Sequence, residues 1–132
     1  MTFDKAGLED LAARYTEAWN SKKPENVAAF YVPNGQISIN RGDPWVYHEG
    51  VTAMAAGFHA DVPDLLLENE GIRSAGTHVV FLWTFTGHDA QTGNPVKVSG
   101  WEEWELDDDL NVISSLGWFD AEDYQRQADG TR

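Results

Sequence analysis

Apolar residues recur at helical spacing near the start of the chain and again before its midpoint. The first helix is predicted from one stripe, with Asp4 as its N-cap, and the stripe consists of Leu8, Leu11, Ala12, Tyr15, Ala18 and Trp19. Pro24 suits the first turn of a short second helix. A third helix is predicted around Val51, Met54, Ala55 and Phe58, ending before Pro63. Between the second and third helices, alternation over 35–40 predicts a strand, and we expect the loop over 41–50 to be irregular.

The second half of the chain has the alternation of β-strands. Four long strands are expected over 65–74, 77–88, 95–106 and 111–119. Short turns rich in Gly, Asn and Asp separate them, so neighbouring strands should pair as antiparallel hairpins. Asp120 can cap a last short helix that ends at Gln127. We therefore expect an α+β fold in one domain over 1–127, with helices on a curved, mostly antiparallel sheet and a frayed tail over 128–132.

Composition and charge limit the classes of partner. The 132 residues are 42% hydrophobic and include six Trp, which is enough for one core. The 22 acidic and nine basic residues give a net charge of −13, which repels phosphate backbones and anionic lipids. We therefore expect neither nucleic acid nor a membrane as partner. No cysteine is present and the N-terminus has no signal-peptide pattern, so a cytoplasmic location is expected.

A polar pair on predicted inward faces is the main candidate site. In the strand 95–106, the face that carries Glu102 is otherwise apolar. Burial should raise the pKa of this carboxyl, so that it keeps a proton and donates a hydrogen bond. Tyr15, on the apolar stripe of the first helix, is the best partner for it, and such a pair can hold an oxyanion or a polar ligand.

Simpler interpretations of both residues stay open. The Tyr15 hydroxyl could satisfy a backbone carbonyl within the core. Glu102 could reach water past Trp104, and a register slip of one residue would exchange it for Glu103.

Several large apolar side chains are candidates for lining a ligand pocket. They are Trp19, Phe30, Ile39, Phe58, Trp83, Trp104 and Trp118. Trp101 instead shares the polar strand face with Ser and Glu residues, where it suits the interface of a homodimer.

The order of elements resembles the nuclear transport factor 2-like superfamily over nearly the whole chain. The most specific segment is Arg14-Tyr15-x-x-Ala18-x-Asn20 followed by Phe30-Tyr31, which is similar to the opening of ketosteroid isomerase. The resemblance implies a cone-shaped fold like that of the isomerase, the SnoaL-like polyketide cyclases, scytalone dehydratase and limonene epoxide hydrolase. It also implies that Tyr15 donates to a dienolate oxygen, that Glu102 is a second oxyanion acid, and that two copies pair through the outer sheet face.

The chain departs from each family chemistry at a key position. Ile39 stands where the isomerase has its general base, and it cannot accept a proton. Gly117 and Glu103 align with the acid/base aspartate and the histidine of the cyclases. The Arg-x-Asp strand pair of the epoxide hydrolase is also missing, since the only such spacing, Arg41-Gly42-Asp43, lies in a predicted loop.

The four histidines offer a substitute base but no metal site. None shows metal-ligand spacing, and no metal or cofactor is expected. His78 and His88 share the more polar strand face. His59 and His48 could reach the mouth of a cavity, and imidazole titrates in the range that a general base needs.

Two classes of function follow, with a third as a weaker alternative. The first is a cofactor-independent isomerase, cyclase or dehydratase that acts on a small apolar carbonyl compound through Tyr15, Glu102 and a histidine. The second is a non-catalytic binding module for a small apolar ligand. The third is a dimeric scaffold with a filled cavity, and fold alone does not decide among them.

Overall fold

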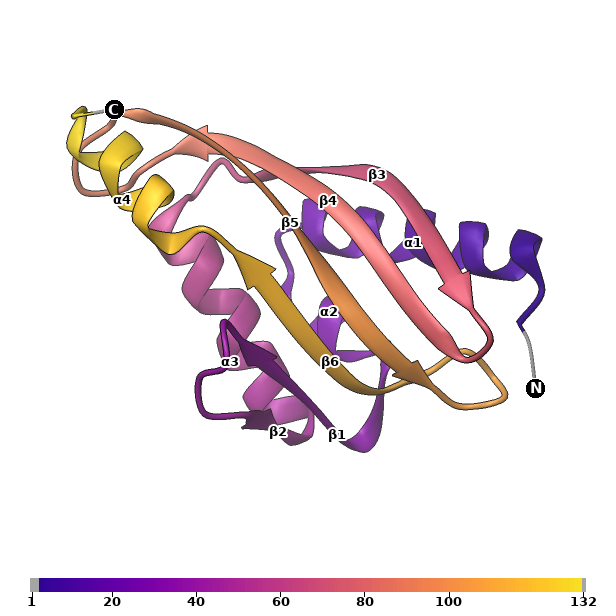
Figure 1. Cartoon of the computed structure of the whole chain (residues 1–132). Helices are drawn as coiled ribbons and strands as arrows, with labels where there is room; N and C mark the ends of the chain where they lie inside the picture. Colours follow the sequence, from indigo (N-terminus) through magenta and orange to yellow (C-terminus); the bar gives the residue numbers. More distant parts are fainter. Residues whose placement is uncertain (1–2, 132) are drawn as a thin grey trace.

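The structure is a computed structural model that describes residues 3–131. Its helices are α1 (Lys5–Asn20), α2 (Pro24–Ala28), α3 (Tyr47–Asp61) and α4 (Ala121–Asp129). Its strands are β1 (Tyr31–Ile39), β2 (Trp45–Val46), β3 (Leu66–Ala75), β4 (His78–His88), β5 (Pro95–Leu106) and β6 (Val112–Phe119). The strands form one sheet in the order β2-β1-β6-β5-β4-β3 (Figure 1).

The topology is that of an open α+β fold, which confirms the expected class. Only β1 and β6 run parallel among the paired strands, and all other neighbours are antiparallel. The helices α1, α2 and α3 lie on one face of the curved sheet, and α1 packs against β3 while α3 packs against β1 (Figure 1). No helix within residues 3–131 is long and apolar enough to span a membrane.

The N-terminal helix begins where its sequence predicts. The Asp4 carboxylate accepts the backbone N–H of Gly7, so it provides the expected N-cap. The buried side of α1 is the predicted stripe, with Tyr15 fully buried at its centre. Because α1 lies across the concave face, this phenol is directed toward the inner side of the sheet.

The segment 41–50 is more regular than expected. Trp45 pairs with Ile37 and Val46 pairs with Gln36, which makes β2 a short edge strand. The helix α3 begins directly afterwards at Tyr47, which has a positive φ of 63°. The strand β2 exists only through its pairing with β1, and the composition of the segment itself does not reveal that pairing.

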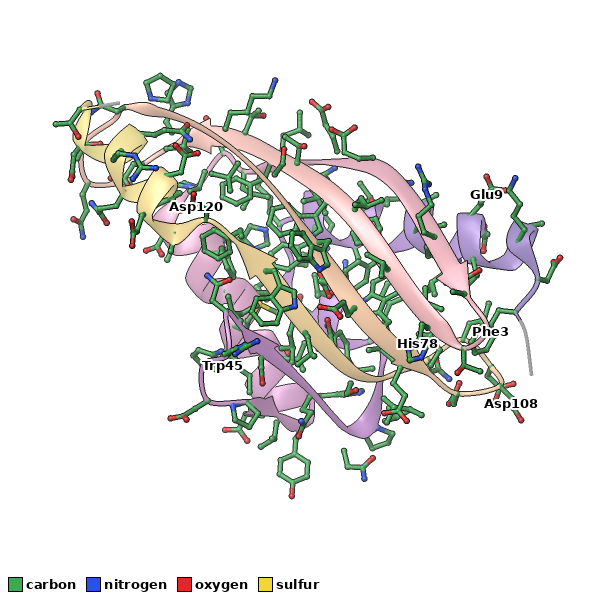
Figure 2. All side chains as sticks on the ribbon, viewed as in Figure 1. Phe3, Glu9, Trp45, His78, Asp108 and Asp120 are labelled. Carbon is green, nitrogen blue, oxygen red and sulfur yellow. The ribbon has the colours of Figure 1, made fainter. Side chains whose placement is uncertain are left out.

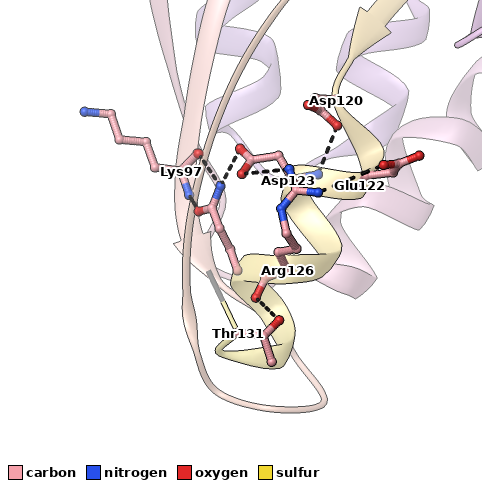
Figure 3. Close-up of polar contacts among 7 residues, drawn as sticks. Lys97, Asp120, Glu122, Asp123, Arg126 and Thr131 are labelled. Carbon is pink, nitrogen blue, oxygen red and sulfur yellow. Dashed lines mark hydrogen bonds and ion pairs between the residues drawn. The ribbon is translucent and has the colours of Figure 1, made fainter.

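The C-terminal segment is attached to the sheet rather than frayed. Asp120 caps α4, and Gln127 exchanges two hydrogen bonds with the backbone of Lys97 (Figure 3). Helix α4 continues through Asp129, beyond the predicted end, and Ala128 is buried. The Thr131 backbone N–H donates to the Arg126 carbonyl, so residues 128–131 are hydrogen-bonded to the helix. Arg132, the last residue of the expected tail, lies outside the described residues.

Side chains from the concave face of the sheet and from the helices fill the interior (Figure 2). Strand β5 shows the alternation most clearly, because every second residue from Val96 to Leu106 is buried and the residues between them are exposed. The predicted inward direction of Glu102 is therefore confirmed. The same register directs Trp101 and Glu103 to the outer face.

Candidate active site

Glu102 lies in a row of residues that crosses the middle of the sheet. It pairs with Phe81 of β4 on one side and with Gly117 of β6 on the other, and Gly117 pairs with Ile39 of β1. A Cβ atom at Gly117 would lie 2.9 Å from Ile39 Cδ1 and 3.9 Å from Glu102 Cγ. The glycine therefore leaves free space beside the carboxyl group.

One oxygen of the Glu102 carboxyl collects all of its hydrogen bonds. Oε1 accepts the Ser115 hydroxyl at 2.7 Å, the Trp104 indole N–H at 2.9 Å and the Tyr15 hydroxyl at 3.0 Å. The Tyr31 hydroxyl lies 3.4 Å from the same oxygen. Four donors from α1, β1, β5 and β6 thus converge on one atom in the interior.

The two phenols form a short relay that ends on the carboxyl. Their hydroxyl oxygens are 3.0 Å apart. Each phenol has a single proton, and because Tyr15 donates its proton to Oε1, Tyr31 donates to the Tyr15 oxygen or, at the longer distance, to Oε1. Tyr15 is therefore committed to Glu102 and holds that side chain in place.

Burial dominates the electrostatics of this cluster. It raises the pKa of Glu102 above the usual value for a carboxyl, while the hydrogen bonds from Trp104, Ser115, Tyr15 and Tyr31 oppose that shift. Burial and the nearby Glu102 charge raise the pKa of Tyr15 and of Tyr31 well above 10. Both phenols consequently stay protonated near neutral pH, and Glu102 is the member of the cluster that can change its protonation state.

The second oxygen of Glu102 has no hydrogen-bond partner among the described residues. Within residues 3–131, every hydrogen bond of the Glu102 carboxyl ends on Oε1, and Oε2 is not among the fully buried unpartnered atoms, unlike the indole nitrogen of Trp19. Glu102 is one of the residues that line the cavity above Gly117. Oε2 therefore has free hydrogen-bonding capacity, as an acceptor when Glu102 is ionised and as a donor when it is protonated.

The cavity is small and almost entirely apolar. The space open to the centre of a water molecule measures about 40 Å³. About 10–15 Å³ on this measure accommodates one water molecule, so there is room for roughly three. The wall consists of Trp19, Ile37, Ile39, Met54, Phe58, Leu65, Leu67, Trp83, Phe85, Glu102, Gly117 and Phe119. Glu102 is the single ionisable residue in this described wall.

Aromatic rings surround much of the cavity. Phe58 contacts Phe85 and Phe119 at centroid distances of 6.5 and 5.9 Å. Trp83 contacts the same two rings at 5.9 and 6.5 Å, which closes a cycle of four rings. Trp19 joins the cycle through Phe58, at 6.0 Å. Ring-to-ring contacts of this kind hold the aromatic part of the cavity wall in place.

The cavity opens toward a groove between α3 and β2. Ile39, Met54 and Phe58 belong to the walls of both spaces. Trp45, Gly57 and Asp61 complete the outer groove, and a Cβ atom at Gly57 would meet nothing within 4 Å. A ligand that enters by this route passes between Ile39, Met54 and Phe58.

The structure brings Tyr15 and Glu102 together, but they do not lie as two donors that point at one ligand oxygen, which was the expected arrangement. Tyr15 does not belong to the described cavity wall, and its hydroxyl is bound to Glu102, which does. The expected role of Tyr15 as a donor to a ligand therefore has no geometric support. Its hydroxyl acts on Glu102 instead.

Four of the seven predicted lining residues are in the cavity wall: Trp19, Ile39, Phe58 and Trp83. The other three lie elsewhere. Phe30 packs edge-on against Tyr15, and Trp104 stacks on Phe81 while its N–H is bound to Glu102. Trp118 lies on the outer face, beside Trp101 and below the Arg41 guanidinium.

The histidines do not supply the missing base. His48 lies in the first turn of α3 and its Nε2 donates to the Tyr31 carbonyl at 2.6 Å. His59 Nε2 donates to the Trp19 carbonyl at 3.1 Å, and burial lowers the His59 pKa, so this imidazole is neutral near pH 7. Neither residue belongs to the described cavity wall. No three His, Asp or Glu side chains among residues 3–131 gather as a metal site would require.

Several residues of the site were not predicted. Tyr31 and Ser115 complete the hydrogen-bond cluster, and Ile37, Met54, Leu65, Leu67, Phe85 and Phe119 complete the cavity wall. The sequence did contain a signal for Ser115, because this serine lies at an inward-facing position of its strand. In the structure it is buried and pairs with Ile37 of β1. For the cavity wall, apolar periodicity identifies buried residues but does not separate packed core from cavity.

A family model of the SnoaL-like domain matches residues 12–112. The chain belongs to the SnoaL-like family. This membership confirms the expected nuclear transport factor 2-like superfamily. No curated protein matches the chain.

Solved structures support the fold of this SnoaL-like chain. A protein from Catenulispora acidiphila with a ketosteroid isomerase-like fold, in complex with trimethylamine, has a TM-score of 0.83 at 15% identity, covering 91% of this chain and 92% of that one. TsrD from Streptomyces laurentii has a TM-score of 0.81 at 20% identity, covering 98% and 99%. A protein described as a SnoaL-like polyketide cyclase from Jannaschia sp. CCS1 has a TM-score of 0.78 at 16% identity, covering 96% of each chain.

Proposed function

We propose that this SnoaL-like protein binds one compact, mostly apolar carbonyl compound and exchanges a proton with it through Oε2 of Glu102. The observation that carries the proposal is the asymmetry of the carboxyl: donors occupy Oε1, and Oε2 is left to the cavity. A buried carboxyl with a raised pKa works closer to neutral pH than an exposed one.

The arrangement suits reactions in which a single group first accepts a proton from the substrate and then returns it. In the ionised form, Oε2 takes a proton from a carbon next to the carbonyl group; the C–H bond breaks, its electron pair enters the enolate, and Oε2 becomes protonated. When the compound carries a β,γ double bond, the enolate extends to the γ-carbon, and return of the proton from Oε2 to that carbon completes a shift of the double bond to the α,β position. The donors on Oε1 hold the carboxyl in one orientation throughout, and the aromatic wall excludes bulk water. Of the isomerase, cyclase and dehydratase alternatives, this geometry favours the isomerase.

A non-catalytic binding module is the second candidate. It is favoured by the commitment of the Tyr15 hydroxyl to Glu102 and by the positions of His48 and His59, which leave the described cavity wall with a single ionisable group. In this alternative the same cavity holds the ligand and no proton moves.

Proton exchange into a small ketone tests the two candidates. Butanone has about five non-hydrogen atoms, a size that the cavity accommodates. We expect the wild-type protein to exchange its α-protons for deuterium in D₂O, followed by ¹H NMR, and Glu102→Gln to reduce the rate by about 100-fold or more. Glu103→Gln is the matched control on the opposite strand face and should exchange like the wild type. Butanone that binds without Glu102-dependent exchange would establish the binding module instead.

We also propose a homodimer through the outer sheet face. Trp101 and Leu116 are 42% and 44% exposed there, and Trp101 stacks against Trp118 at 6.5 Å. Exposed apolar side chains at the centre of a sheet face are typical of an interface core. Sedimentation should show a dimer that Trp101→Lys converts to monomer while the cavity is unchanged.

A further inference from the structure

The cavity combines three features that together define a ligand class. Its wall carries one carboxyl group, the described wall contains no basic residue, and five aromatic rings contribute to it: Trp19, Phe58, Trp83, Phe85 and Phe119. From these we infer that the cavity binds a compact alkylammonium cation, held by the Glu102 carboxylate and by the aromatic rings. This inference rests on the ligand cavity of the proposed function, and it adds a charged ligand class to the neutral carbonyl compound.

The first step of the argument concerns the charge of Glu102. Its Oε1 accepts hydrogen bonds from Ser115, Trp104 and Tyr15, with Tyr31 next to them. Several hydrogen-bond donors on one oxygen stabilise the ionised form of the carboxyl group, because hydrogen bonds to a carboxylate are stronger than hydrogen bonds to a neutral carboxyl oxygen. The described residues of the wall include no cationic side chain that could pair with Oε2. A bound cation supplies the missing countercharge.

The second step concerns which cation. Na⁺ and similar ions keep their water shells, and the side chains of the described wall offer no oxygen ligand besides Glu102 to replace them. An alkylammonium ion is weakly hydrated at its methyl groups, and aromatic faces attract its charge. The cycle formed by Phe58, Phe85, Trp83 and Phe119 gives the closed set of rings that recognition of this kind uses.

The third step concerns size. A sphere of the cavity's volume, about 40 Å³ for the centre of a water molecule, has a radius of about 2.1 Å. Adding the ~1.4 Å radius of a water molecule places the wall about 3.5 Å from the centre. A compact ion of about five non-hydrogen atoms, such as tetramethylammonium, fits a space of this size, whereas a larger ligand requires Met54 or Phe58 to move.

The entrance repeats the same chemistry. The outer groove adds Trp45, which is 43% exposed, and the carboxylate of Asp61 to the shared residues Ile39, Met54 and Phe58. No basic residue lies in the described wall of this groove. A cation therefore meets an indole and a carboxylate before it reaches Glu102, and the net charge of −13 further favours its approach.

Calorimetric titration with tetramethylammonium chloride at constant ionic strength tests the inference. We expect binding to the wild-type protein and a loss of about 30-fold or more in affinity for Glu102→Gln. Gln can keep the hydrogen bonds of Oε1 through its carbonyl oxygen, so this variant should fold, and near-ultraviolet circular dichroism checks that it does. Glu103→Gln removes the same charge from the outer face and should bind like the wild type.

A pH series adds a second readout. Tyr15, Tyr31, Trp104 and Ser115 face Glu102 from α1, β1, β5 and β6, and of these neighbours both phenols stay neutral. Since the cation binds the carboxylate, the affinity of the wild type should fall as pH decreases through the Glu102 pKa, and that of Glu102→Gln should stay flat. A neutral ketone does not require the carboxylate for binding and should lack this loss.

The outcomes separate this inference from the proposed function. Binding of butanone without binding of tetramethylammonium overturns the alkylammonium inference and leaves the proposed function intact. Equal tetramethylammonium affinity in the wild type and Glu102→Gln also overturns the inference. If neither probe binds, both fail together. Phe119→Leu is an independent variant, expected to weaken tetramethylammonium binding by about three- to tenfold, and an unchanged affinity would remove the aromatic part of the inference.

Discussion

Glu102 and Glu103 are neighbours in β5 with the same chemistry and opposite environments. Glu102 is 5% exposed on the concave face, where four donors surround one of its oxygens. Glu103 is exposed on the convex face, where the Trp101 indole N–H approaches it at 3.3 Å. One step along a strand changes a solvated surface charge into the only ionisable group of the described cavity wall.

The tryptophans on either side of this pair show the same division. Trp104 is buried, stacks on Phe81 and gives its N–H to Glu102. Trp101 stacks on Trp118 over the outer surface and is 42% exposed. The concave face thus holds the buried hydrogen-bond cluster of Glu102, and the convex face carries exposed apolar side chains. Alternation alone assigns each residue to its face.

Glu102→Ala should produce the largest difference between the two faces. Removal of the carboxyl leaves the hydroxyls of Tyr15, Tyr31 and Ser115 and the Trp104 N–H without their common acceptor. The unfolding free energy should fall by about 3–5 kcal/mol, because unpaired buried donors and a new cavity both destabilise. Glu103→Ala should change it by less than about 0.5 kcal/mol. Urea denaturation measures both, and equal effects would remove the distinction between the faces.

Tyr15→Phe should have an intermediate effect. It removes one hydrogen bond of Glu102 and keeps the ring contacts with Phe30, Phe81 and Trp104, so we expect a loss of about 1–2 kcal/mol in unfolding free energy. The Glu102 pKa should rise further, because the Tyr15 hydrogen bond lowers it. Carboxyl ¹³C NMR titration measures that shift. Tyr47→Phe, at a 60% exposed tyrosine, is the control and should alter neither quantity.

The smallest expected effect is a pH dependence of stability. The folded-state pKa of Glu102 is raised above 4.5, so the folded protein binds this proton more tightly than the unfolded chain does. The unfolding free energy of the wild type, relative to Glu102→Gln, should therefore increase as pH falls through the raised pKa and level off near pH 4.5. Asp64 and Asp89, whose pKa values are lowered, lose stabilisation on acidification in both proteins, so their effect cancels in the difference. A flat difference would show that Glu102 titrates as an exposed carboxyl does.

The strands and the inward direction of Glu102 could be predicted because they depend on local alternation. The expected strand 95–106 and the observed β5 have the same bounds. The edge strand β2 could not be predicted in this way, since its two residues form a strand only by pairing with β1. Phe30, Trp104 and Trp118 were expected in the cavity wall because hydrophobicity predicts burial and leaves open what each ring contacts.

The sequence by itself determined the α+β class, the order of its elements apart from β2, the N-caps Asp4 and Asp120, and the alternation of faces along β5. These features depend on spacing and on interactions between near neighbours. The tertiary structure decided that Tyr15 and Ser115 donate hydrogen bonds to Glu102 and that Tyr31 lies next to the Tyr15 hydroxyl. It also decided that Gly117 leaves space beside the carboxyl group. Tyr15, Tyr31, Glu102 and Ser115 come from four separate elements, and only the packing of α1 across the sheet and the register of β1, β5 and β6 bring their atoms within hydrogen-bonding distance.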